Sequence, residues 1–260
     1  MGKLDGKVAL VTASADGIGL AIATSLAHEG ALTYIADINM ELATSNADNL
    51  CENGYLAKAI EFNALDNISI VNCVLKIIED AGRVDILVNN FGGTNPKIDR
   101  SIMDTKVEDF DHYVLAHLNS VFLTSQTVIN KAMINQKSGS IINITSVSGI
   151  NPDITQISYG TSKAAIFHMT KQIAIQSAKY NICCNAVAPG MIDTKAVTNN
   201  LTKEFAEIFL RNTPISRMGK PSEIADAVLY FACSSYTTGQ LLSVNGGFGI
   251  STPLYSYLVK

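Results

Sequence analysis

Three polar side chains, Ser146, Tyr159 and Lys163, have the types and the spacing that acid/base chemistry needs. Tyr159 and Lys163 stand four positions apart in a helical pattern, which places the phenol and the ammonium on one face of a helix. Ser146 follows an apolar run, residues 140–145, that predicts a buried strand. A phenol has an ordinary pKa of about 10, and a nearby ammonium favours its ionised form. The three groups therefore indicate proton transfer to or from a carbonyl or hydroxyl oxygen.

Each of these residues also has an ordinary structural explanation. A tyrosine and a lysine one helical turn apart are commonly a surface pair whose stems cover apolar area. Ser146 could simply cap the end of the strand. Their significance therefore depends on what the rest of the chain builds around them.

Strand patterns alternate with helical patterns along the whole chain. Strands are predicted near residues 7–12, 32–37, 55–62, 84–90, 140–145, 182–187 and 240–244. Helices are predicted near residues 20–29, 40–53, 66–81, 107–134 and 221–233, and a further helix carries Tyr159 and Lys163. Such alternation favours a parallel sheet that is covered on both faces and wound in two directions from a central switch point. The sequence thus predicts one α/β domain over residues 1–260, a Rossmann-type doubly wound fold with a seven-stranded parallel sheet and helices on both faces.

A glycine-bearing turn, residues 13–19, joins the first predicted strand to its helix, and Asp37 ends the second strand. A turn of this kind suits a pyrophosphate, because the backbone can approach closely and the helix N-terminus offers free N–H groups. A carboxylate after the second strand can accept hydrogen bonds from both ribose hydroxyls, and it would repel a 2′-phosphate. The pattern predicts NAD rather than NADP. By itself, Asp37 would be explained as an exposed acid at a strand end.

These motifs resemble, in order and over nearly the whole chain, those of the short-chain dehydrogenase/reductase family. The family pattern is TGxxxGxG, NNAG, a helical Asn, a Ser, YxxxK and PG. The matching segments are residues 12–19, 89–92, Asn119, Ser146, 159–163 and 189–190. Two positions depart from the pattern. Ala13 replaces the first glycine of the turn, which costs little if φ there is negative, and Phe91 takes the third position of NNAG, where we assign it to core packing.

The resemblance implies a role for each matching residue. Tyr159 exchanges a proton with the substrate, Ser146 holds the substrate oxygen, and Lys163 holds the nicotinamide ribose. Asn119 is implied to hold a water that links Lys163 to solvent. The cofactor contacts implied are Ser14, Asp16, Gly17, Ile18, Asp37, Ile38, Asn63, Ala64, Asn90, Tyr159, Lys163, Pro189, Gly190, Ile192 and Thr194.

A closer resemblance, carried by residues 90–95, 152–154, 185–190 and 246–255, is to bacterial 7α-hydroxysteroid dehydrogenases of the clostridial type. It implies an NAD-dependent oxidoreductase that reversibly oxidises the 7α-hydroxyl of bile acids, with Ser146, Asn151 and Tyr159 contacting the steroid. Relatives of that type often prefer NADP and carry a basic residue before the second glycine of the turn. This chain has Asp16 there, so the opposite preference is expected.

Two further segments are candidates for the substrate cleft. Within residues 191–213 an apolar face recurs at helical spacing, as in a lid over a greasy substrate. A helix packed on its own core would give the same periodicity. The aromatic tail, residues 246–260, can line a cleft or dock on a neighbouring subunit. The family resemblance implies a homotetramer.

The formal net charge of −4, without a Lys/Arg cluster, gives no electrostatic reason to expect nucleic acid. The five cysteines and four histidines lack metal-ligand spacing, so we expect no metal site, and we interpret the histidines as surface or packing residues. No leader-like segment or membrane-length apolar run stands out, and we expect no membrane contact and a cytoplasmic location.

Three alternatives stay open. The same catalytic set would serve a 12α- or 3α-hydroxysteroid dehydrogenase, because the shape of the cleft decides which position reacts. It would also serve a 3-ketoacyl-type reductase, although Asp37 weighs against an NADPH-dependent enzyme. A nucleotide-sensing binding protein that has lost the chemistry would show damage among Ser146, Tyr159 and Lys163, and none is visible.

Overall fold

The computed structural model describes residues 2–200 and 202–250, and its seven strands form one parallel sheet. The strand order is β3-β2-β1-β4-β5-β6-β7, which confirms the predicted doubly wound topology. The strands are β1 (Val8–Thr12), β2 (Leu32–Asp37), β3 (Ala57–Glu61), β4 (Ile86–Asn89), β5 (Gly139–Ile144), β6 (Ile182–Pro189) and β7 (Leu241–Val244).

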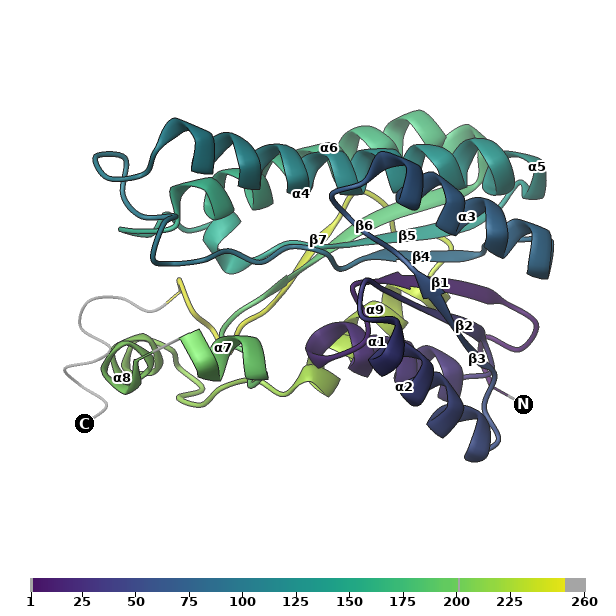
Figure 1. Ribbon diagram of the computed structural model, residues 1–260, viewed down its shortest axis with the longest axis horizontal. Helices are drawn as coiled ribbons and strands as arrows, with labels where there is room; N and C mark the ends of the chain where they lie inside the picture. The colour runs from purple at the N-terminus through teal and green to yellow at the C-terminus, as the bar shows by residue number, and fades with distance from the viewer. Residues whose placement is uncertain (1, 201, 251–260) are drawn as a thin grey trace.

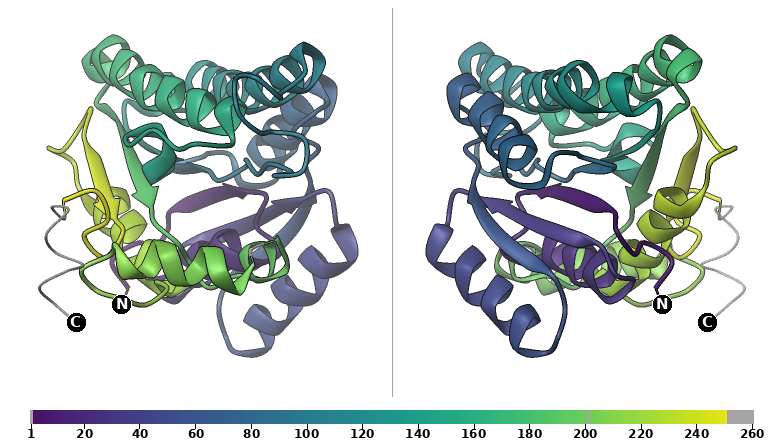
Figure 2. Two further views of the ribbon diagram at one scale, coloured as in Figure 1. Left: turned by 90° about the vertical axis from the view of Figure 1, so that its left-hand side faces the viewer. Right: turned by 90° about the vertical axis from the view of Figure 1, so that its right-hand side faces the viewer.

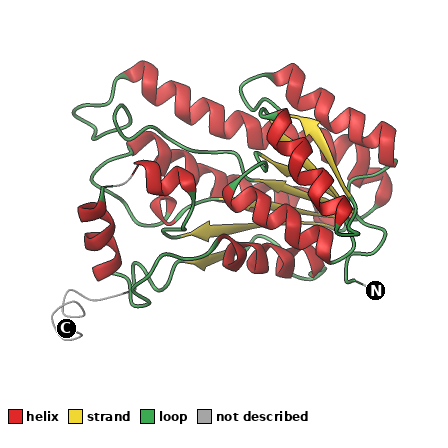
Figure 3. Cartoon of the chain, turned by 60° about the horizontal axis from the view of Figure 1, so that its bottom comes forward, coloured by secondary structure: helices red, strands yellow, loops and turns green. Residues whose placement is uncertain are grey.

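Helices cover both faces of the sheet (Figure 1). One layer holds α1 (Gly17–His28), α2 (Met40–Glu52) and α9 (Pro221–Cys233), and the other holds α3 (Asn67–Ala81), α4 (Val107–Val128) and α6 (Ile157–Ser177). The strands lie between the two helical layers, as Figure 3 also shows. Alternate residues of β1 point to opposite layers, since Ala9 and Val11 pack with α1 and α9 whereas Val8 and Leu10 pack on the other side. This two-sided burial explains why the strands are continuous apolar runs.

The switch point lies between β1 and β4, where the chain turns from one half of the sheet to the other. Two hydrogen bonds from Asn90, which follows β4, tie these strands together at their carboxyl ends. Its backbone N–H donates to Thr12 Oγ1 at 3.0 Å, and its side-chain Nδ2 donates to the carbonyl of Ala13 at 2.8 Å. A ligand crevice is expected outside this edge of the sheet.

Several elements depart from the predicted boundaries. The helix predicted over 107–134 ends at Val128 and continues as a π-turn (Ile129–Met133) and a short α5 (Ile134–Gln136). The amphipathic face predicted within 191–213 lies on two short helices, α7 (Lys195–Asn200) and α8 (Lys203–Arg211). Both lie at one end of the molecule, outside the two layers (Figure 2). None of the helices in the described residues is long and apolar enough to cross a membrane.

The start of α6 is held by a carboxylate from a distant loop. The first helical N–H groups need acceptors from outside the helix, and Asp99 supplies two of them: its Oδ1 accepts from Ser158 N at 2.9 Å and its Oδ2 from Tyr159 N at 3.0 Å. Oδ2 also accepts from the hydroxyl of Thr94 at 2.8 Å. Asp99 is fully buried, so this cap is shielded from water.

Replacing Asp99 by Ala is expected to lower the free energy of unfolding by about 2 kcal/mol, because two buried backbone donors lose their acceptors. Asp99→Asn, which keeps one carbonyl oxygen, should lose less. Denaturant unfolding measures both. Asp104→Ala removes an exposed acid of the same loop and is the control, with an expected change within about 0.5 kcal/mol. Equal losses in the two alanine variants would contradict the capping role.

Candidate active site

Tyr159 and Ser146 meet at the carboxyl end of β5, as their spacing predicts. Ser146 comes two residues after the strand, and its Oγ accepts from Ser148 N at 3.2 Å, which caps the 3₁₀ turn Val147–Gly149. The same hydroxyl lies within hydrogen-bonding reach of Tyr159 and works to lower the pKa of the phenol. Desolvation is the larger influence, and it raises the pKa of Tyr159 above its usual value. The phenol is therefore protonated at neutral pH.

Lys163 is 1% exposed, and its Nζ donates to the carbonyl of Ile144 at 3.0 Å. Burial lowers the pKa of Lys163 to about 8. Its Nζ lies over the Tyr159 ring, 5.5 Å from the ring centre, and its hydrogen bond is to Ile144 O and not to the tyrosine hydroxyl. The expected lowering of the Tyr159 pKa by Lys163 is accordingly absent from the influences on that phenol, and Ser146 is the group that acts in this direction.

The turn after β1 is a cradle for a dinucleotide. A side chain at Gly19 would collide with the carbonyl of Ala13 and the amide of Asn90, at 2.5 and 2.6 Å from its Cβ, so only glycine fits there. Ala13 has φ +49, so our condition of a negative φ is not met. An alanine in this left-handed region carries a strain of roughly 1 kcal/mol that a glycine would avoid. The turn nevertheless keeps the backbone path that a pyrophosphate requires.

Asp37 extends from the end of β2 toward this turn. Its Oδ2 accepts from Ala15 N at 3.0 Å and its Oδ1 from Asn39 N at 2.9 Å. Each carboxylate oxygen can accept a second hydrogen bond, so the side chain can still bind ribose hydroxyls. Asp16 is the N-cap of α1, accepting from Gly17 N at 2.8 Å, and its other oxygen lies 3.5 Å from Lys195 Nζ.

The other predicted cofactor residues fall into two groups. Ile18, Asn90, Tyr159, Lys163, Pro189, Gly190, Ile192 and Thr194 line one cavity of about 310 Å³. Ser14, Ile38, Asn63 and Ala64 lie outside that cavity, along the turn and the ends of β2 and β3. The hydroxyl of Ser14 is fully buried, donating to Val11 O and accepting from Ala36 N, and its backbone N–H donates to Ala36 O, so Ser14 is engaged within the fold.

Asn119 does not lie where the family resemblance implies. Its side chain is exposed, and its Nδ2 donates to Asn67 Oδ1 at 2.6 Å, away from Lys163. The helix face that meets Lys163 instead carries His117, which is 1% exposed. Residues two positions apart on a helix point to nearly opposite sides. Helical phase could have revealed this, because His117, Val121, Thr124 and Val128 form the buried stripe of α4, and Asn119 is out of phase with it.

Phe91 packs against the core as expected, and its ring also meets the edge of the His117 ring at 5.7 Å. Asn151, predicted to contact the substrate, is not part of the cavity wall around Tyr159. Its amide lies against Gly249. Tail residues 251–260, including Leu254, Tyr255, Tyr257 and Leu258, lie outside the described residues.

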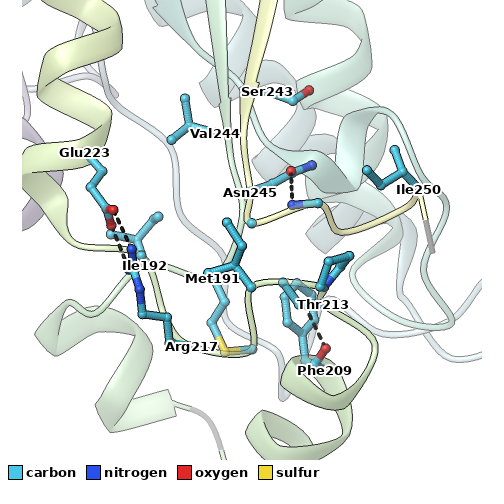
Figure 4. A pocket seen from close by; sticks show the side chains of 15 residues that line it. Met191, Ile192, Phe209, Thr213, Arg217, Glu223, Ser243, Val244, Asn245 and Ile250 are labelled. Carbon is cyan, nitrogen blue, oxygen red and sulfur yellow. Dashed lines mark hydrogen bonds and ion pairs between the residues drawn. The ribbon is translucent and has the colours of Figure 1, made fainter. Parts of the chain in front are cut away.

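A second cavity of about 450 Å³ adjoins the first (Figure 4). The two share Met191, Ile192 and Phe209, so their walls are continuous. Phe209 of α8 stacks on Phe248 with ring centres 4.3 Å apart, which joins α8 to the segment after β7. Arg217 is paired with Glu223 at 2.6 Å, as the dashed lines in Figure 4 mark. Within the described residues, no group of three or more His, Cys, Asp or Glu side chains could hold a metal ion.

Comparisons with known proteins agree with this geometry. Residues 12–249 match the family described as enoyl-(acyl carrier protein) reductase. The chain is 43% identical over 258 residues to the 7α-hydroxysteroid dehydrogenase of Clostridium sardiniense, covering 98% of each chain. It is 39% identical over 254 residues to the 3-oxoacyl-(acyl-carrier-protein) reductase FabG of Thermotoga maritima, covering 95% of this chain and all of that one. The crystal structure of gox2181 superposes with a TM-score of 0.90 at 33% identity, covering 96% of this chain and 98% of that chain.

Oxidoreductases of this kind use nicotinamide cofactors, which fit the glycine cradle, the free acceptor positions of Asp37 and the buried ammonium of Lys163. The chain belongs to the short-chain dehydrogenase/reductase family of oxidoreductases, as its motifs, its strand order, and its sequence and structural similarity to known proteins show.

Proposed function

We propose that this protein is an NAD-dependent dehydrogenase that reversibly oxidises a secondary alcohol of a steroid, and that its substrate is the 7α-hydroxyl of bile acids. The observation that carries the reaction is the meeting of Ser146, Tyr159 and Lys163 in one cavity. The 43% identity to a 7α-hydroxysteroid dehydrogenase over 98% of both chains supports the substrate.

The side chains divide the chemistry between them. A substrate oxygen between Ser146 and Tyr159 would accept a hydrogen bond from the serine and exchange a proton with the phenol. Because the pKa of Tyr159 is raised, the phenol keeps its proton at neutral pH, and this proton can be donated to a carbonyl. In the oxidising direction the Ser146 hydrogen bond works to lower the pKa of the phenol and so favours its ionised form. A bound nicotinamide supplies or accepts the hydride.

Asp37 supports NAD as the cofactor. Its carboxylate lies at the end of β2 beside the glycine turn, with Ile38 and Asn39 next in the chain. A 2′-phosphate at this point would face a negative charge, whereas ribose hydroxyls would face hydrogen-bond acceptors. Asp16 adds a second carboxylate at the start of α1.

The walls around Tyr159 support a large apolar substrate. Val197, Phe205 and Phe209 from α7 and α8 line the cavity together with Met191. Through Met191 and Phe209 the surface continues into the second cavity toward Ile250 (Figure 4). A short-chain alcohol would leave most of this surface uncovered. We therefore propose residues 191–213 as the substrate lid of a single domain over residues 1–260.

A homotetramer forms part of the proposal. Leu115 and Phe122 lie on the exposed face of α4, 63% and 50% accessible, and Leu242 of β7 is 39% accessible. Apolar side chains on a long helix and on an edge strand suit contacts with further copies of the chain.

A second candidate is a 3-ketoacyl-type reductase. It is favoured by the 39% identity to FabG, and the same serine, tyrosine and lysine would carry it. Asp37 argues against it to the extent that the reaction needs NADPH.

The substrate is tested with bile acids that carry hydroxyls at positions 3, 7 and 12, assayed with NAD by the formation of NADH. We expect turnover only where a 7α-hydroxyl is present. Tyr159→Phe is the matched control, because it removes a single oxygen; it should lower kcat by about 100- to 10,000-fold and leave NAD binding intact. Turnover confined to acyl thioesters, or to short-chain alcohols, would refute the steroid assignment.

Asp37→Ala should lower the preference for NAD over NADP by at least about tenfold, or 1.4 kcal/mol, because the repelling charge and the ribose acceptors are both lost. The measurement is the ratio of kcat/KM for the two cofactors. Asp48→Ala, an exposed acid on α2, is the control. An unchanged ratio in Asp37→Ala would refute the ribose contact.

Lys163→Met should abolish turnover yet raise the free energy of unfolding at pH 7 by about 2 kcal/mol. The pKa shift from 10.5 to about 8 corresponds to about 3 kcal/mol of destabilisation in the wild type, and the lost bond to Ile144 O offsets about 1 kcal/mol.

Since the native pKa of Lys163 is lowered, the wild type carries this penalty in full below pH 8 and loses it as pH rises toward 10.5, where the unfolded lysine also deprotonates. The gain in Lys163→Met should therefore shrink over that range. Denaturant unfolding from pH 7 to 10 measures it, with the exposed Lys76→Met as control. A less stable Lys163→Met at pH 7 would contradict the expectation.

A further inference from the structure

We propose that His117 is a positioning residue for the catalytic lysine: as a neutral imidazole it joins the Gly92–Gly93 turn to α6 and so fixes the place of Lys163. The proposal rests on the oxidoreductase function proposed above. His117 lies on the same helix as Asn119, which the motif pattern had linked to Lys163 through a water.

His117 bridges two segments that enclose Lys163. Its Nδ1 lies 2.8 Å from Ser162 Oγ, next to Lys163 in α6, and its Nε2 lies 2.9 Å from the carbonyl of Gly93. Ser162 is fully buried, so the contact with Nδ1 is shielded from solvent, whereas Gly93 lies at the surface. The imidazole therefore sets the distance between the turn after β4 and the helix that carries the lysine.

The turn at Gly92 lies directly against Lys163. A Cβ at Gly92 would lie 2.4 Å from Lys163 Nζ and 3.7 Å from His117 Cδ2, and Gly92 has φ +145. The ammonium and the imidazole thus approach the same residue of the turn. A shift of this turn by a fraction of an ångström would change the contact at Nζ.

The hydrogen bonds define the tautomer. A carbonyl can only accept, so Nε2 carries the proton that is donated to Gly93 O. A neutral ring then has a lone pair at Nδ1, which accepts from the hydroxyl of Ser162. The same hydroxyl is also placed to donate to the carbonyl of Tyr159 at 2.8 Å, so these two acceptors compete for its single proton. An added proton at Nδ1 would turn the Ser162 hydroxyl away from the ring and toward Tyr159 O.

The surroundings keep the ring neutral. Burial and the Lys163 ammonium lower the pKa of His117 to about 4, and His112 acts in the same direction. Asp99 and the bond to Gly93 O act in the opposite direction and are outweighed. The rings of Tyr113 and Tyr159 also face the imidazole, with centres 6.1 and 6.0 Å away. Lys163 therefore has no second cation as its neighbour.

Two variants separate hydrogen bonding from volume. His117→Gln can donate to Gly93 O and accept from Ser162 without titrating, whereas His117→Leu fills the space and makes neither bond. We expect His117→Leu to lower kcat by about 100-fold, the size of effect that an ångström-scale misplacement can have, with a smaller change in KM. His117→Gln should recover at least about a tenth of the wild-type kcat. His112→Leu, an exposed histidine of the same helix, is the control.

Equal kcat values for His117→Leu and His117→Gln would overturn the proposal. So would loss of turnover in Asn119→Leu together with full turnover in His117→Leu. Turnover is measured with whichever secondary alcohol or ketone the wild type converts. If the wild type does not turn over bile acids, the substrate assignment is refuted, but this test of His117 can still be carried out.

A second measurement needs no turnover. The unfolded histidine binds a proton below about pH 6.5, but the native one does so only near pH 4. The wild type should therefore lose stability between pH 6.5 and 4.5 more steeply than His117→Gln, seen as a larger fall in the denaturant midpoint. Groups that are distant from His117 titrate alike in both proteins, so the comparison cancels their contribution. Parallel midpoints over this range would show a charged or exposed ring and overturn the proposal.

Discussion

The buried ammonium of Lys163 is the constraint around which the site is built. A charge with 1% exposure is costly, and within the described residues its one direct protein acceptor is the carbonyl of Ile144 at the end of β5. The ammonium is therefore kept in place more by the segments packed around it than by hydrogen-bond partners. Three neighbouring segments supply that position: the end of β5, the turn at Gly92, and α6 itself.

These segments are fixed by polar groups buried between the sheet and the helices. Asn89 of β4 donates to Asn143 of β5 at 2.8 Å and to Ser125 of α4 at 3.0 Å, and Asn143 donates to Thr170 of α6 at 2.9 Å. This one network fixes the position of two strands relative to two helices. In any other arrangement these buried polar groups would lose their hydrogen-bond partners, which costs free energy. Asp99 also restrains α6, because its carboxylate accepts hydrogen bonds from the first turn of that helix. The proposed reacting groups are aligned by the core, so α7 and α8, outside the layers, can vary without disturbing them.

Much of this followed from sequence, and the failures have physical causes. Apolar runs and their alternation with helices predicted the sheet, because strands buried on both faces have little freedom in composition. Motif matching singled out Ser146, Tyr159 and Lys163, and the structure brings these three into one cavity. It failed at Asn119, where a plausible residue type outweighed helical phase, and the buried stripe of α4 carries His117 instead. It could not foresee φ +49 at Ala13, since the strain at this position is set by tertiary contacts. The capping of α6 by Asp99 is a long-range contact with no local pattern.

The residues that indicate the type of reaction lie in the core, whereas those that would select the substrate lie at one end of the molecule. The groups that we propose to move protons lie on α6 and at the end of β5, within the packed layers. The walls that would select a substrate come from α7, α8 and the segment after β7, joined by the stacking of Phe209 on Phe248. Because these walls lie outside the layers, their side chains can change without cost to the core. Relatives that match nearly the whole chain at 43% and 39% identity but carry different substrate names are what such a division would produce.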